Sequence, residues 1–317
     1  MTDSPLVVVE GLRKVYRTGP KEVVALRDVT FSIHPGELVA VRGRSGSGKT
    51  TLLNQIGGLD KADAGRVVVD GHEVTAMSEN ELLTLRRDVV GFVFQSFGLI
   101  PVLSAAENVG VPMRLLRTPA VEREARVRML LALVGLEQHV NQRPYELSGG
   151  QRQRVAIARA LAVRPVALIA DEPVSMLDVS IRLGVLRLLE GLARDSGLAL
   201  LYITHDIASA RYFAEDITVM YAGRLIESGP SEELTQSPRH PYTQLLLESA
   251  PDPDRVAAPG GRRHGEPPSL IDPPGGCRFH PRCPVALPVC STEVPGRTEL
   301  GEGHWTHCWQ AEAALTR

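Results

Sequence analysis

The sequence predicts an α/β fold built around a parallel sheet that carries a phosphate-binding loop, and three observations predict it. The apolar run 38–41 leads into a glycine-rich segment and then into helical spacing over 51–56. The runs 166–170 and 198–203 are apolar throughout, as in parallel strands that are covered on both faces. Residues 6–40 also alternate turn signals with short apolar runs at 6–9, 23–26 and 29–33, a pattern typical of separate antiparallel strands.

The glycine-rich segment has the order of a P-loop, with a strand, glycines, a lysine, a hydroxyl and a helix. Glycines let backbone N–H groups approach phosphate oxygens, and the helix directs its positive end at the same anion. Lys49 would reach the β- and γ-phosphates of a nucleotide, and the Thr50 hydroxyl would bind Mg²⁺. A Rossmann loop is disfavoured because its glycine spacing differs, and a turn that binds nothing is the other alternative. The predicted phosphate-binding residues are Gly43, Arg44, Ser45, Gly46, Ser47, Gly48, Lys49, Thr50 and Thr51.

Composition and charge limit the remaining functions. The net charge is −2, so the overall balance does not favour nucleic acid as the main partner. No apolar run approaches the ~18 residues of a membrane span, and the first residues lack the pattern of a signal peptide. We therefore expect a cytosolic protein that reaches a membrane only through a partner.

Two acidic residues close the apolar run 166–170. Ligands bind at the carboxyl ends of parallel strands, so Asp171 and Glu172 are expected beside the P-loop. Asp171 can hold Mg²⁺ through water, and Glu172 can polarise an attacking water. A helix-capping pair is the alternative interpretation, which the upstream P-loop disfavours.

The segment 147–151, Leu-Ser-Gly-Gly-Gln, is the most specific in the chain. Here the sequence resembles the ATP-binding-cassette (ABC) family, whose signature is this string. A serine N-cap before a glycine-rich helix start also makes an anion site of Ser148, Gly149, Gly150 and Gln151. The resemblance implies that this site meets the γ-phosphate of an ATP held by another subunit, hence a head-to-tail dimer with two ATPs.

Four further positions match motifs of this family. Tyr16 matches the aromatic residue that stacks on adenine, although plain packing is the alternative. Gln95 matches the glutamine that senses Mg²⁺ and water and links to the membrane subunit. Asp178 matches the aspartate that contacts the partner's P-loop, and His205 matches the switch histidine that clamps the γ-phosphate. The resemblance implies a P-loop NTPase of the ABC type, with an antiparallel β subdomain and a helical signature subdomain.

The two halves of the chain resemble different branches of the family. The segments 15–19, 52–60 and 91–100 resemble ATPases of lipoprotein release and macrolide efflux. The segments 171–180 and 221–227 resemble oligopeptide/dipeptide permease ATPases, as do 237–243 and the cysteine tail. We favour peptide uptake, because the tail is a dedicated feature. Lipoprotein release or macrolide efflux is the first alternative, and a soluble ABC ATPase without a transport role is the second.

The resemblance also implies partners and a location. The partners are a second ABC ATPase subunit, identical or a paralogue, integral membrane permease subunits and an extracytoplasmic substrate-binding protein. The expected location is the cytoplasmic face of the cell membrane, as a peripheral subunit.

The composition changes after about residue 229, where proline and glycine become frequent. We predict a nucleotide-binding domain over 1–230, a helical segment with a Pro/Gly-rich linker over 231–270, and a small separate cysteine-bearing extension over 271–317. The extension has too little apolar content to fold around its own core, so we expect a metal to stabilise it.

All four cysteines lie in that extension, at Cys277, Cys283, Cys290 and Cys308. In a reducing cytosol this clustering favours a metal over disulfides or plain structural thiols. Resemblance to the peptide-permease tail implies a 4Fe-4S cluster held by all four, with a structural or redox-sensing role. Zinc is the alternative, because four thiolates suit it and His280, His304 and His307 are near in sequence.

Overall fold

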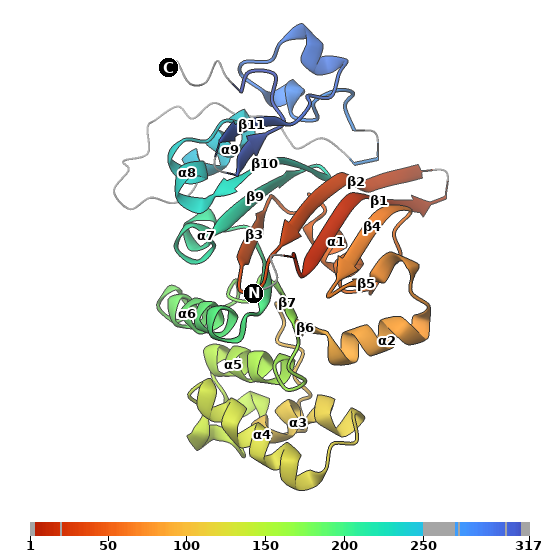
Figure 1. Ribbon diagram of the computed structural model, residues 1–317. Helices are drawn as coiled ribbons and strands as arrows, with labels where there is room; N and C mark the ends of the chain where they lie inside the picture. The colour runs from red at the N-terminus through yellow and green to blue at the C-terminus, as the bar shows by residue number, and fades with distance from the viewer. Residues whose placement is uncertain (1–3, 20, 250–269, 272, 302, 312–317) are drawn as a thin grey trace.

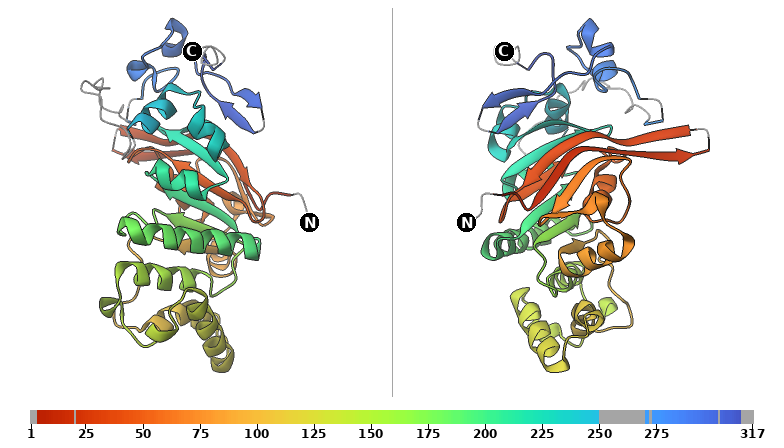
Figure 2. Two further views of the ribbon diagram at one scale, coloured as in Figure 1. Left: turned by 90° about the vertical axis from the view of Figure 1, so that its left-hand side faces the viewer. Right: turned by 45° about the vertical axis from the view of Figure 1, so that its right-hand side comes forward.

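The computed structural model describes residues 4–19, 21–249, 270–271, 273–301 and 303–311. Two sheets form the middle of the molecule (Figure 1). A group of helices extends from one end, and the C-terminal extension lies at the other (Figure 2). None of the helices in these ranges combines the length and the apolar character that crossing a bilayer requires.

The N-terminal part of the chain forms a four-stranded antiparallel sheet with the order β2-β1-β4-β5. Its strands are β1 (Val7–Thr18), β2 (Lys21–Ile33), β4 (Ala64–Val69) and β5 (His72–Glu73). The apolar runs 23–26 and 29–33, expected as separate strands, both belong to β2. A shift in register accommodates Asp28, whose φ is 56°, so the strand continues past the expected break.

The larger sheet has eight strands in the order β11-β12-β10-β9-β3-β8-β7-β6. They are β3 (Leu38–Arg42), β6 (Val90–Val93), β7 (Ala167–Asp171), β8 (Ala199–Thr204), β9 (Asp216–Tyr221), β10 (Arg224–Pro230), β11 (Thr298–Gly301) and β12 (His304–Thr306). Neighbours from β6 to β9 run parallel. The predicted parallel strands are confirmed, and β6 is a further parallel strand that was not predicted.

The central strands separate two hydrophobic cores. All residues of β3 and β8 are buried, as expected for strands covered on both faces. Leu38 and Ala40 belong to one core, while Val39 and Val41 belong to the other. Each fully buried valine or leucine contributes roughly 1.5–3 kcal/mol, so the strand that leads into the P-loop is held from both sides.

Nine α-helices occur in the described part of the chain. They are α1 (Lys49–Ile56), α2 (Glu79–Asp88), α3 (Ala105–Leu115), α4 (Ala120–Leu133), α5 (Gly149–Ala160), α6 (Val179–Ser196), α7 (Ile207–Phe213), α8 (Ser231–Gln236) and α9 (Pro241–Glu248). Helices α3, α4 and α5 lie together at the end of the molecule away from the extension (Figure 1). Capping boxes at Ser104 and Ser148 fix the starts of α3 and α5.

The C-terminal extension is joined to the main body through the larger sheet. Strand β12 pairs with β10, with Ser228 opposite Trp305, so β11 and β12 extend the large sheet. Phe279 is buried in one core and Trp305 in the other. The extension therefore shares existing cores instead of building its own. Residues 250–269 of the predicted segment 231–270 lie outside the described residues, and the division into three domains stays a prediction.

Candidate functional site

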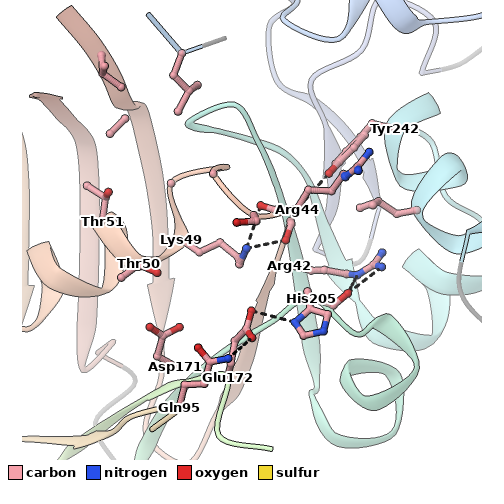
Figure 3. Close-up of a pocket in the computed structure, with 18 of the residues that line it drawn as sticks. Arg42, Arg44, Lys49, Thr50, Thr51, Gln95, Asp171, Glu172, His205 and Tyr242 are labelled. Atoms are coloured by element: carbon pink, nitrogen blue, oxygen red, sulfur yellow. Dashed lines mark hydrogen bonds and ion pairs between the residues drawn. The ribbon is translucent and has the colours of Figure 1, made fainter. Parts of the chain in front are cut away.

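A cleft of about 1100 Å³ opens between the P-loop and the carboxyl ends of the parallel strands (Figure 3). It brings together most of the predicted nucleotide site, although these residues come from distant parts of the sequence. The predicted residues that line it are Tyr16, Gly43, Arg44, Ser45, Gly46, Gly48, Lys49, Thr50, Thr51, Gln95, Asp171, Glu172 and His205. Ser47 does not line the cleft, and its side chain is buried.

Close packing explains the glycines of the P-loop. Gly48 has φ 106°, and a Cβ there would stand 2.5 Å from the carbonyl oxygen of Ala25 in β2. A Cβ on Gly43 would clash with the carbonyl oxygen of Met220 in β9. The loop can therefore pack between β2 and β9 only because Gly43 and Gly48 have no side chains. Without side chains at these positions, the backbone N–H groups of the loop stay accessible to a ligand in the cleft.

Lys49 starts helix α1 and lies within the loop. Its Nζ donates to the carbonyl oxygens of Gly43 at 2.7 Å and Arg44 at 3.1 Å. Burial lowers the pKa of Lys49, while the nearby carboxylates of Glu172 and Asp171 oppose that shift. The side chain thus places a cation at the start of a helix, where a phosphate group is favoured electrostatically.

Glu172 directly follows β7 and lies between two other predicted residues. Its Oε1 is 3.0 Å from Nδ1 of His205, and its Oε2 accepts a hydrogen bond from Nε2 of Gln95 at 3.4 Å. Its φ of 46° is unusual for a residue with a side chain, and its N–H donates to the carbonyl of Ile203 in β8. Such strain is typical of functional positions. A carboxylate oriented in this way can act as a base toward water.

The residues expected to bind Mg²⁺ line the same cleft. The hydroxyl of Thr50, the carboxylate of Asp171 and the amide of Gln95 offer the oxygen ligands that Mg²⁺ prefers. Burial raises the pKa of Asp171, the neighbouring Glu172 raises it further, and Lys49 opposes both. A divalent cation would balance this concentration of negative charge, so the donor set fits Mg²⁺.

Tyr16 lines the cleft from β1, as expected for an adenine contact. Its side chain is partly exposed, and its hydroxyl donates to Oδ2 of Asp60 at 2.8 Å. The ammonium of Lys14 lies 5.0 Å from the ring centroid. These contacts fix the ring in place, and its role toward adenine stays a prediction.

The signature residues and Asp178 do not line the cleft. Ser148 caps α5, where its Oγ accepts from the N–H of Gln151 at 3.3 Å. Gly150 faces Ile181 in α6 so closely that a Cβ on it would stand 2.5 Å from Cγ2 of Ile181. A Cβ on Gly149 would stand 3.3 Å from Cδ2 of Leu177, and Leu177 directly precedes Asp178, the N-cap of α6, so the signature and the 175–178 loop lie side by side.

Several residues of the cleft were not predicted. Arg42 ends β3, and its Nε and Nη2 donate to the carbonyl of His205 at 3.3 and 3.2 Å, while burial lowers its pKa to about 10. Arg42 could have been noticed because it directly precedes the P-loop. The C-terminal residues Tyr242, Leu245, Leu246, Ser249, Leu270 and Arg282 also line the cleft. No pattern in the sequence indicates this contact between segments about 200 residues apart.

The four cysteines line one small cavity in the extension, together with Phe279 and Trp309. None of the four forms a disulfide. Burial raises the pKa values of Cys277 and Cys283, and that of Cys308 to about 11. Among the described residues, no group of three or more His, Cys, Asp or Glu side chains is arranged to hold a metal ion. The expected metal staple is therefore unsupported, and the contacts that the described residues show between the extension and the main body include packing contacts.

Comparisons with known proteins match both parts of the chain. A model of the ABC transporter family matches residues 26–175, and a model of the oligopeptide/dipeptide transporter C-terminal region matches residues 226–290. A Brucella ovis protein named "Putative peptide import ATP-binding protein" is 40% identical over 97% of this chain and 98% of its own length. A Brucella abortus protein of the same description is 37% identical over 99% of this chain and 100% of its own.

Among solved structures, the dimeric ATP-binding cassette MJ0796, in a post-hydrolysis state with ADP and Pi, is 40% identical with a TM-score of 0.66. The match covers 71% of this chain and 98% of that one. The described fold therefore agrees with an ABC cassette to which a C-terminal region has been added. This chain belongs to the ABC transporter ATP-binding proteins and carries the C-terminal region of the oligopeptide/dipeptide transporters.

Proposed function

We propose that this chain is the ATP-hydrolysing subunit of an ABC transporter that takes up oligopeptides or dipeptides. The observation that carries the proposal is the cleft in which the P-loop, Asp171, Glu172 and His205 meet. The relatives named for peptide import support the substrate class, because their similarity spans both halves of the chain. The resemblance to efflux ATPases, by contrast, rests on the first half alone.

The residues of the cleft have different roles in ATP hydrolysis. Lys49 and the P-loop N–H groups bind the phosphates, and Thr50, Asp171 and Gln95 hold Mg²⁺, which neutralises charge on the phosphates. Glu172 accepts a proton from the attacking water, and His205 orients Glu172 through its 3.0 Å contact and clamps the γ-phosphate. Tyr16 stacks on the adenine.

A second ATPase subunit completes each site. Ser148, Gly149, Gly150, Gln151 and Asp178 lie outside the cleft of their own chain, so they are available to the nucleotide of a partner. The solved relative MJ0796 is dimeric, which supports a head-to-tail pair. The partner is a second copy or a paralogue.

Membrane permease subunits dock beside Gln95. Phe94, Ile100 and Val102 are exposed apolar side chains in this segment, and Val102 is 72% exposed. Such a surface favours contact with another protein. We place the chain on the cytoplasmic face of the cell membrane as a peripheral subunit, in a system that includes an extracytoplasmic peptide-binding protein.

Co-purification tests this function. The tagged chain is isolated from detergent-solubilised membranes, and its partners are identified by mass spectrometry. Permease subunits and a peptide-binding protein are the expected partners. Recovery of a lipoprotein-release or efflux permease would overturn peptide uptake, and recovery of no membrane partner at all would favour a soluble ABC role.

We also propose that the four cysteines hold a 4Fe-4S cluster, with zinc as the alternative. The support is that Cys277, Cys283, Cys290 and Cys308 line one cavity, which four thiolates around a cluster require. Burial raises the pKa values of Cys277, Cys283 and Cys308, and binding to a cluster would replace the protons on these three thiols. Anaerobically purified protein should be brown and lose its colour in Cys283→Ser. Colourless protein with stoichiometric zinc would reverse the assignment without affecting the ATPase.

A further inference from the structure

The C-terminal part of the chain forms one wall of the nucleotide cleft. Tyr242 and Leu246 of α9 line the cleft, and so do Leu270 and Arg282, which lie beyond the nucleotide-binding domain that the sequence predicts. Figure 3 shows Tyr242 across the cleft from the carboxylates, beside Arg44 of the P-loop. The extension therefore bounds the space that a nucleotide would occupy.

Direct bonds attach this wall to the nucleotide-binding elements. The N–H of Arg44 donates to the Tyr242 hydroxyl at 3.3 Å, and the N–H of Val24 in β2 donates to the carbonyl of Leu270 at 3.3 Å. Phe279 packs on the Tyr242 ring, with 5.5 Å between centroids. The wall is thus fixed to the P-loop and to β2 rather than resting beside them.

Arg282 is the cation of this wall. Its Nη1 donates to the Tyr221 hydroxyl at 3.4 Å, and its guanidinium lies 5.7 Å from the Phe279 ring centroid. Its Nε is buried without a hydrogen-bond partner, and no acidic side chain in the described part of the chain forms an ion pair with it. Because this guanidinium lines the cleft and has no carboxylate partner among the described residues, an anionic group of a bound ligand would be a favourable partner for it.

Arg282 adds to a positive lining that already includes Lys49, Arg42 and Arg44. Arg42 also has a buried nitrogen, Nη1, without a partner among the described residues. Planar guanidinium groups suit phosphate oxygens, and a polyphosphate is the anionic ligand that the P-loop selects. We infer that Arg282 binds the phosphate groups of the nucleotide, so that the extension contributes a residue to the ATP site.

The position of Arg282 in the chain connects the nucleotide to the cysteines. Arg282 ends the short 3₁₀ helix η4 (His280–Arg282), and Cys283 follows it directly. Phe279 lines the cysteine cavity and packs on Tyr242 on its other side. The guanidinium is therefore held by a segment whose two ends, Cys277 and Cys283, both face that cavity.

Equilibrium nucleotide binding to the full-length chain tests this inference, which rests on the proposed ATP site. Arg282→Ala should weaken ATP binding about tenfold, and Arg282→Lys should weaken it less, because the charge remains. The loss should be larger for ATP than for AMP and should shrink at high salt, because the contact is electrostatic. Arg297→Ala is the matched control, since Arg297 lies in the extension but outside the cleft, near Trp305.

The outcomes separate this inference from the proposed function. Unchanged ATP affinity in Arg282→Ala overturns the inference, as does an equal loss for ATP and AMP that salt does not alter. Lys49→Ala is measured in parallel. If Lys49→Ala loses ATP and Arg282→Ala does not, only the role of Arg282 fails. If Lys49→Ala binds ATP as well as the wild type, the proposed ATP site itself fails.

Discussion

The carboxylate of Glu172 is paired with the imidazole of His205, with Oε1 3.0 Å from Nδ1. The two residues follow neighbouring parallel strands, β7 and β8, so the register of the sheet brings them together. His205 is in turn held from behind by Arg42, whose guanidinium donates to its carbonyl oxygen. Glu172, the proposed base, and His205, the proposed γ-phosphate contact, thus position each other. Arg42, the last residue of β3, fixes His205 to the strand that leads into the P-loop.

Glu172→Gln should retain ATP binding but lower hydrolysis by at least ~100-fold, because an amide keeps the shape but cannot accept the proton from water. The variant should accumulate as a dimer with ATP bound. Phosphate release and size-exclusion chromatography measure the two effects, with Glu124→Gln on the surface of α4 as the control. Near wild-type hydrolysis would exclude Glu172 as the base.

The two phosphate-binding elements should respond differently to mutation. Lys49→Ala should weaken ATP binding, because it removes the cation inside the P-loop of the same chain. Ser148→Arg should leave binding largely intact and block hydrolysis, because Ser148 lies outside the cleft and serves the nucleotide of a partner. Fluorescent-nucleotide titration and phosphate release distinguish these effects. Equal loss of nucleotide binding in both variants would contradict a shared site.

The sequence predicted the local elements of the site because each rests on a short pattern. The P-loop, Asp171 with Glu172, and the start of α5 at the signature are each specified within a few residues. Gln95 and His205 could be placed only by resemblance, yet they lie at strand ends where the sheet brings such residues together.

What the sequence could not predict depends on contacts between distant segments. The pairing of β12 with β10 joins the extension to the large sheet, and the apolar content of the extension alone gave no sign of it. The expectation of a metal staple followed from treating the extension as isolated. Phe279 and Trp305 instead complete cores formed elsewhere in the chain. The contribution of Tyr242 and Arg282 to the cleft depends on the same packing.

Gly150→Ala should destabilise the protein, although alanine is favoured over glycine in helices by about 1 kcal/mol. The added Cβ would stand 2.5 Å from Cγ2 of Ile181, a branched side chain that cannot move away easily, and overpacking of this kind costs about 1–3 kcal/mol. At Gly149 the nearest atom is the end of the Leu177 side chain at 3.3 Å, so Gly149→Ala is the milder control.

The midpoint of urea unfolding measures this contact. Ile181→Ala should recover part of the loss in the double variant, because it removes the atom that clashes. Additive effects of Gly150→Ala and Ile181→Ala would show that the two residues do not interact. The predicted contact between the signature and α6 would then be wrong.

His304 should make the docking of the extension depend on pH. Its Nε2 is 2.9 Å from Glu227 and its Nδ1 is 3.0 Å from Glu233. Burial alone would lower the pKa of His304, but the hydrogen bonds to Glu227 and Glu233 outweigh it and raise the pKa above the ordinary 6.5. The stabilisation is therefore fully present below pH 6.5 and is lost as the pH rises through the folded pKa.

His304→Gln should remove this dependence. The free energy of unfolding, measured by denaturant titration at several pH values, should decline above pH 6.5 more steeply in the wild type than in His304→Gln. His72→Gln is the matched control, because His72 is exposed in β5. The carboxylate of Glu227 also accepts from the N–H groups of Arg239 and His240, so it remains partly satisfied in the variant. Identical slopes for wild type and His304→Gln would mean that His304 is not protonated between the two glutamates.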